Sequence, residues 1–155
     1  MKQDHAVRLL GQGLAEAAAA REHLDYSFQQ VASLSANLQD ATAAQLESVE
    51  AFTSRFARTV DLLVNKVLRS LDQVELMPEG TLLDVVNRAE KRGLVDQASV
   101  LREMKAVRNA IAHDYAGLRM AEIFAFCREQ KPVFDAICDR VAAYADRVLG
   151  NGPQG

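Results

Sequence analysis

The sequence of 155 residues has no tryptophan, two cysteines and three prolines, and aromatic residues make up only 6% of it. Cys127 and Cys138 lack any CxxC or Cys/His spacing, which argues against a disulfide framework and a zinc module. No apolar run is long enough to span a membrane, and Arg8 and Glu16 interrupt the apolar residues near the N-terminus, so no signal peptide is indicated. We therefore expect a cytoplasmic protein with no metal site, no other cofactor and no membrane association.

A strong positive charge is also missing. The 21 acidic residues outnumber the 18 Lys and Arg residues, giving a net charge of −3, so nucleic acid would have to be attracted by a local basic surface. With 49% apolar and 25% charged residues, the composition is typical of one compact domain. We expect this domain at residues 13–149, with a flexible N-terminus at 1–12, where Gly11 and Gly13 weaken a helix, and a flexible tail at 150–155.

The apolar residues that are present recur at helical spacing, and no strand pattern is visible. Between about Asp40 and Leu76, two rows with a seven-residue period predict the seam of a helical bundle. The rows are Val49, Phe56 and Leu63, and Val60, Val67 and Val74. The charged residues between them predict a solvated face, made by Arg55, Arg58, Asp61, Lys66, Arg69 and Asp72.

Further helices are predicted on both sides of this segment. One should run from about Leu14 to Leu38, and a short one should begin at a Thr81–Asp84 capping box and end at Gly93. Another should run from an Asp96 cap to about Tyr115, and the last should be kinked or restarted at Pro132. The sequence thus predicts an all-α fold, an antiparallel up-and-down four-helix bundle with an additional short helix.

One polar cluster stands out near the end of the fourth predicted helix: Arg108-Asn109-Ala110-Ile111-Ala112-His113-Asp114-Tyr115. On a regular helix, five steps separate Arg108 from His113 by roughly 140° and about 7.5 Å, so one helix cannot aim both at a single phosphate. Either the helix unwinds near Asp114, where Gly117 permits it, or two copies of the chain bring their motifs together across a dyad.

This stretch resembles the signature of HEPN-domain proteins, in particular the Arg-Asn-x-x-x-His-x-Tyr form of HepT-type toxins. Upstream residues are similar to the related nucleotidyltransferase substrate-binding group, and the resemblance covers roughly Val49 to Tyr115. The residues that carry it are Ala51-Phe52, Arg55-Phe56, Leu62-Leu63 and Lys66, and then Val86 to Val95 with Ala89 and Gly93-Leu94-Val95.

The resemblance implies a HEPN-like helical bundle that acts as a homodimeric, metal-independent endoribonuclease, the toxin of a toxin-antitoxin pair neutralised by a minimal nucleotidyltransferase. Arg108 and His113 would be catalytic, with Arg108 holding the RNA phosphate and His113 taking a proton from the 2′-hydroxyl. Asn109 and Asp114 would support them. Tyr115 would be the site of adenylylation by the antitoxin, which requires an exposed hydroxyl.

Other interpretations of the same residues stay open at this stage. The chain also fits a non-catalytic module that binds a nucleotidyltransferase through this surface, or a purely structural helical dimer. In a purely structural role, Arg108 pairs with a buried carboxylate, His113 is favoured at a helix C-terminus by the helix dipole, and Tyr115 is a core residue. Basic residues near the motif are typical of a solvated helix or of a rim for RNA, namely Lys91, Arg92, Arg102, Lys105 and Arg119.

Overall fold

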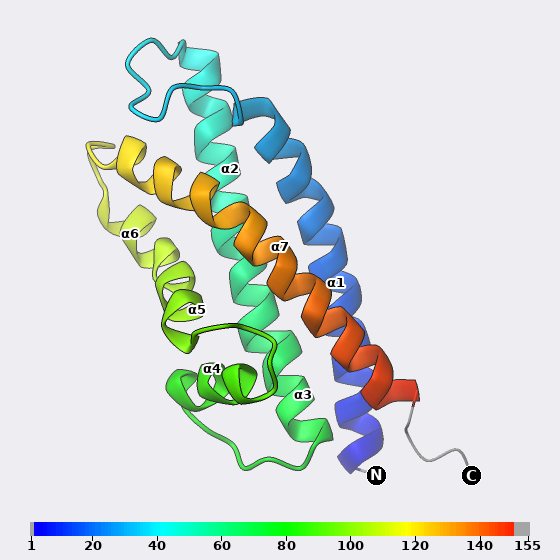
Figure 1. Ribbon diagram of the computed structural model, residues 1–155. Coiled ribbons are helices and arrows are strands. Elements are labelled where there is room, and N and C mark those ends of the chain that lie inside the picture. The colour runs from blue at the N-terminus through cyan, green and yellow to red at the C-terminus, as the bar shows by residue number, and fades with distance from the viewer. Residues whose placement is uncertain (1, 151–155) are drawn as a thin grey trace.

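A computed structural model describes residues 2–150, and all regular secondary structure in this range is helical, which confirms the all-α bundle (Figure 1). The elements are α1 (Lys2–Val31), α2 (Ala43–Asp61), the π-helix η1 (Leu62–Leu68), α3 (Arg69–Val74), α4 (Leu82–Lys91), α5 (Ala98–Lys105), α6 (Val107–His113) and α7 (Met120–Gly150). The segments α2, η1 and α3 follow one another without interruption and form one long rod.

Three long elements form the body of the bundle. Helix α1 packs along the rod from α2 through η1 to α3, and α7 crosses α2 and also contacts α1 (Figure 1). Helices α5 and α6 pack against α2, and the short α4 packs against α5 and η1. The arrangement leaves α6, which carries the polar motif, at the edge of the bundle beside α2 and α7.

The predicted heptad rows form the core. Every residue of the two rows, from Val49 to Val74, is buried, which confirms the predicted seam. Phenylalanines from three helices meet around it: Phe52 lies 5.8 Å from Phe28 and 6.1 Å from Phe124, and Phe56 lies 5.6 Å from Phe134, measured between ring centroids. Such tilted and edge-to-face pairs are favourable beyond their burial.

The two cysteines are free thiols of the apolar interior. Cys127 is fully buried and Cys138 is partly buried. Burial raises the pKa of each thiol to about 12, because the thiolate is poorly solvated there. Neither cysteine therefore has the character of a nucleophile.

Helix α1 begins earlier than its sequence predicts. The expected start at Leu14 is wrong: residues 2–12, expected to be flexible, are helical, because Ala6 and Leu10 are buried in the core and outweigh the low helix propensity of two glycines. Gly13 is itself buried, and a Cβ there would lie 3.4 Å from a methyl group of Val67, so glycine allows α1 to approach η1 closely. The helix ends at Val31 rather than Leu38.

Residue 1 and residues 151–155 lie outside the described part of the chain. The predicted flexibility of the tail therefore stays a prediction, and of that segment only Gly150, the last residue of α7, is described.

The predicted ends of the short helix α4 are confirmed. Thr81 and Asp84 form a reciprocal capping box, and Gly93 adopts a φ of +77° just after the helix. The amide of Leu94 donates to the carbonyl of Ala89 at 3.0 Å, which completes a Schellman motif. The predicted Asp96 cap is wrong: Gln97 occupies the N-cap of α5 without a side-chain hydrogen bond, and Asp96 instead accepts a hydrogen bond from Arg140 at 3.2 Å.

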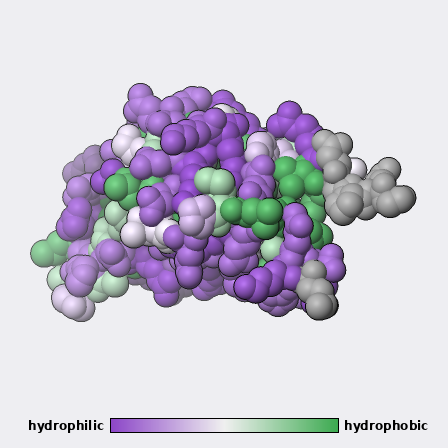
Figure 2. Space-filling model, turned by 90° about the horizontal axis from the view of Figure 1, so that it is seen from below, coloured by the Kyte–Doolittle hydropathy of each residue, from purple (hydrophilic) through white to green (hydrophobic). Residues whose placement is uncertain are grey.

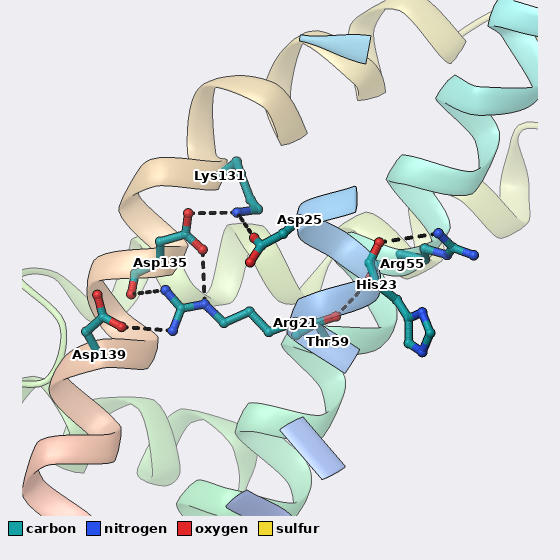
Figure 3. A network of polar contacts seen from close by, with 8 residues as sticks. All are labelled: Arg21, His23, Asp25, Arg55, Thr59, Lys131, Asp135 and Asp139. Carbon is teal, nitrogen blue, oxygen red and sulfur yellow. Dashed lines mark hydrogen bonds and ion pairs between the residues drawn. The ribbon is translucent and has the colours of Figure 1, made fainter. Parts of the chain in front are cut away.

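Charged side chains fasten α1 to α7 (Figure 3). Nζ of Lys131, which is buried, lies 2.6 Å from Asp25 of α1 and 2.7 Å from Asp135 of α7. Arg21 of α1 pairs with both Asp135, at 3.2 Å, and Asp139, at 2.8 Å. The buried ammonium is acceptable in this position because two carboxylates compensate its charge.

Pro132 follows Lys131 inside α7. Of the two outcomes expected there, a kink or a restart, the restart is wrong, because the helix continues through this position. The proline ring is exposed, whereas the neighbouring Lys131 and Phe134 are buried. The contacts of these neighbours hold the helix together on both sides of the missing N–H group.

Asp72 does not lie on a solvated face, so that prediction is wrong for this residue. It is 5% exposed and accepts hydrogen bonds from Arg88 at 3.0 Å and Arg92 at 2.7 Å, both on or next to α4. Arg92 also binds Glu75 at 2.9 Å, and the hydroxyl of Tyr144 donates to the same carboxylate at 2.8 Å. This network joins the end of the rod to α4 and α7.

The lower end of the bundle exposes apolar side chains among hydrophilic ones (Figure 2). Leu76, which is 76% exposed, and Met77 border a groove of about 760 Å³ together with Ala6 and residues of the first turns of α1. No residue of the Arg108–Tyr115 motif lines this groove. Within residues 2–150, every helix is too short or too polar to cross a membrane.

Candidate functional site

The polar motif lies at a break in the chain rather than on one continuous helix. The helix expected from Asp96 to Tyr115 is divided at Ala106 into α5 and α6, and α6 ends at His113. Gly117 adopts a φ of +70° in the turn that follows, so the helix does end where that glycine permits it. This geometry places Arg108 in the first turn of α6 and His113 at its last position.

Arg108 reaches across to the end of α2. Its Nη1 donates to Oδ2 of Asp61 at 2.5 Å, although 71% of the arginine side chain is exposed. Nζ of Lys105 lies 2.8 Å from Oδ1 of the same carboxylate, which is 12% exposed. One largely buried carboxylate thus faces two cations, so the cluster keeps one positive charge at the surface.

Two shallow grooves meet at Arg108. The α2–α6 groove has a volume of about 470 Å³ and is lined by Ser54, Ala57, Arg58, Asp61, Leu62, Asn65, Lys66, Arg108 and Ile111. The α5–α6 groove is of the same size and is lined by Leu82, Ser99, Arg102, Glu103, Lys105, Ala106, Arg108 and Asn109. Basic side chains therefore border Arg108 on both sides, an arrangement that favours the binding of a chain of phosphate groups.

Two of the basic residues expected near the motif, Arg102 and Lys105, do line these grooves. Arg92 and Arg119 are instead engaged elsewhere, Arg92 with Asp72 and Arg119 with Glu122 at 3.2 Å.

Sequence analysis missed the contribution of the rod. Arg58, Asp61 and Lys66 were assigned to a solvated face, yet they line the α2–α6 groove. Arg58 and Asp61 are three residues apart, a spacing that places them on one helix face and was a usable signal. Lys66 is five residues beyond Asp61 and would not share that face on a regular helix, so spacing alone does not place it in the groove.

His113, the last residue of α6, and Tyr115, which follows just after the helix, lie together. Their rings are 6.5 Å apart and nearly perpendicular, and the tyrosine side chain is exposed over 90% of its surface. Tyr115 is therefore not a core residue. His113 is exposed as well.

Asp114 closes the turn between α6 and α7. Both of its carboxylate oxygens accept a hydrogen bond from the backbone N–H of Arg119 at 3.1 Å, just before α7 begins. Asp114 also borders a third groove of about 250 Å³, which shares Ser54 and Ile111 with the α2–α6 groove. The wall that begins at Lys66 therefore continues to the turn that holds His113 and Tyr115.

None of these three grooves is lined by both Arg108 and His113, the two residues predicted to be catalytic. Arg108 lines both grooves described above, and His113 lines neither. In the described residues, no group of three or more His, Cys, Asp or Glu side chains is arranged to hold a metal ion. The site is thus a set of basic and polar side chains open to solvent.

The all-helical bundle with an Arg-x4-His motif at a helix end agrees with the expected HEPN-like bundle. Comparison with family models gives the narrower assignment: residues 14–141 match the model described as ribonuclease HepT-like. The chain therefore belongs to the HepT-like ribonuclease family. Comparisons with curated proteins and with solved structures return no match.

Proposed function

We propose that this protein is the toxin of a toxin-antitoxin pair and cleaves RNA as a homodimer without a metal ion. The observation that carries the proposal is the surface around α6, where Arg108 stands exposed between two basic grooves and His113 ends the same helix. The membership in a family of ribonucleases supports the choice of RNA as the substrate. The protein would encounter its RNA substrate in the cytoplasm.

The proposed reaction uses the ribose itself as the nucleophile. His113 takes the proton of the 2′-hydroxyl, the 2′-oxygen attacks the adjacent phosphorus, and the bond to the 5′-oxygen breaks as that oxygen takes a proton from water. His113 then returns its proton to the solvent. Arg108 contacts the phosphate and stabilises the charge that develops on it. The products are a 2′,3′-cyclic phosphate and a 5′-hydroxyl.

The homodimer follows from the separation of these two groups. Because Arg108 and His113 do not share a groove in one chain, we propose that the groove of one chain receives His113 from the other across a dyad. Asn109, which lines the α5–α6 groove, is assigned to phosphate binding, and Asp114 to holding the turn that carries His113.

The proposal is tested with purified protein and single-stranded RNA in the presence of excess EDTA. We expect cleavage at an undiminished rate and fragments that end in a cyclic phosphate, because neither the nucleophile nor the electrostatic stabilisation comes from a metal. Loss of cleavage on chelation, with recovery on adding Mg²⁺ or Mn²⁺, would contradict the proposed chemistry.

A second proposal concerns control of the toxin by a minimal nucleotidyltransferase antitoxin. The 90% exposure of Tyr115 and its position next to His113 make its hydroxyl an accessible acceptor for an adenylyl group. The added phosphate would place negative charge beside the RNA-binding grooves and block the substrate.

We expect the mass of the intact protein to increase by one adenylyl group when it is incubated with ATP and a nucleotidyltransferase encoded by a neighbouring gene. Tyr115→Phe should abolish the increase, whereas Tyr26→Phe should leave it unchanged, since Tyr26 is also well exposed, at 63%, but lies on α1. Modification of the Tyr115→Phe variant would remove Tyr115 from this role.

The exposed tyrosine also favours one other function, a non-catalytic module that binds the nucleotidyltransferase. Such a module would accept the adenylyl group and form a stable complex, but expression of the unmodified chain would not inhibit growth. Growth inhibition that depends on Arg108 distinguishes the ribonuclease from the module.

A further inference from the structure

Among the residues that the structure describes, Asp61 is the one carboxylate that lines the α2–α6 groove, and it holds the guanidinium proposed to bind phosphate. We propose that Asp61 is a positioning residue, which fixes Arg108 in the orientation that receives the RNA phosphate. The inference rests on the proposed ribonuclease function and adds a residue that the sequence motif does not contain.

The first argument is the geometry of the contact. A guanidinium has five N–H groups in a rigid plane and binds phosphate best through two of them at once. Within residues 2–150, Arg108 contacts Asp61 through Nη1, and neither Nε nor Nη2 has a hydrogen-bond partner. Asp61 thus holds one edge of the guanidinium and leaves another edge open for a two-point contact with phosphate.

The second argument is that Asp61 is itself held in place. Its side chain is 12% exposed, lies at the junction of α2 with η1, and is compensated on its other oxygen by Lys105, with an N–O distance of 2.8 Å. A π-helix is rare and commonly occurs at functional sites. An exposed arginine loses much rotamer freedom when it binds a ligand, and a fixed carboxylate removes part of that freedom in advance.

Neutralising Asp61 has opposite expected effects on RNA cleavage if Asp61 acts only through its charge and if it positions Arg108, which makes the proposal testable. If Asp61 acted only as a negative charge near the groove, its neutralisation would strengthen RNA binding and would not slow cleavage. If Asp61 positions Arg108, its neutralisation lowers kcat while KM stays the same or falls. The reason is that a misplaced Arg108 stabilises the transition state less, when charge develops on the phosphate.

The experiment compares Asp61→Asn with wild type in RNA cleavage. We expect kcat to fall by about 10- to 100-fold, the effect of a small misplacement of a catalytic group, with KM unchanged or lower. The matched control is Asp96→Asn, since Asp96 also pairs with an exposed arginine but lies just before α5, at the opposite end of that helix from the motif, and lines neither groove. In an Arg108→Ala background, Asp61→Asn should have no further effect on kcat, whereas additive losses would overturn the proposal.

A second measurement does not depend on cleavage. In the ¹⁵N NMR spectrum, the Nε–H signal of Arg108, assigned by its loss in Arg108→Lys, should show a high heteronuclear NOE in wild type and a low one in Asp61→Asn. Equal mobility in both proteins overturns the positioning role even if the wild type cleaves RNA. Conversely, an ordered Arg108 in a wild type that does not cleave RNA refutes the proposed function and leaves the role of Asp61 in holding Arg108 intact.

Discussion

His113→Ala is expected to lower the rate of RNA cleavage by about 10²- to 10⁴-fold, the usual contribution of a general base. The side chain is exposed at the end of α6, so its removal leaves no cavity and the fold should be unaffected. His23→Ala is the matched control, because His23 is also exposed on a helix and contributes only its backbone carbonyl to a hydrogen bond. Initial rates on a fluorescent oligoribonucleotide measure the effect, and equal rates for wild type and His113→Ala would exclude this residue from the mechanism.

Mixing variants tests whether the site is shared between two chains. Arg108→Ala and His113→Ala should each be strongly impaired alone, but a mixed dimer retains one site in which Arg108 and His113 are both present. After unfolding and refolding an equal mixture, we expect recovery of about a quarter of wild-type activity, since half of the dimers are mixed and each has one of two sites. No recovery in a mixture that is shown to contain mixed dimers would contradict the shared site.

Asp72→Ala is expected to lower the free energy of unfolding by about 3–5 kcal/mol, the usual loss when one partner of a buried ion pair is removed. The variant leaves Arg88 and Arg92, which are 16% and 10% exposed, without the carboxylate that compensates both charges. Asp139→Ala is the matched control: Asp139 also pairs with an arginine but is 71% exposed, so its removal should change the free energy by less than about 1 kcal/mol.

Urea unfolding followed by circular dichroism measures both variants under the same conditions. Because the network of Asp72 lies at the end of the rod and does not include Arg108, the folded fraction of Asp72→Ala should retain RNA cleavage at low temperature. A stability equal to that of wild type would show that water compensates the two guanidinium groups instead of Asp72.

Periodicity predicted the bundle seam correctly because burial of the rows from Val49 to Val74 is the main gain in free energy along the rod. The same method failed at the N-terminus, since a helix of low intrinsic propensity forms when Ala6 and Leu10 have a core to enter. Charged residues were the other source of error. A pattern records that Asp72 lies between apolar rows, but it does not record that α4 brings Arg88 and Arg92 to it from sixteen and twenty residues away.

The candidate site also has features that the sequence determined and features that only the tertiary structure decided. The order Arg108, Asn109, His113, Asp114, Tyr115 is a local property, so the sequence alone identified the motif, its all-helical setting and the separation of its two central side chains. Tertiary structure decided that Tyr115 is exposed, that Arg58 and Lys66 join Arg108 along one groove, and that Asp61 holds the guanidinium. These contacts join residues more than forty positions apart, and their existence depends on how α6 packs against the rod, which no local spacing encodes.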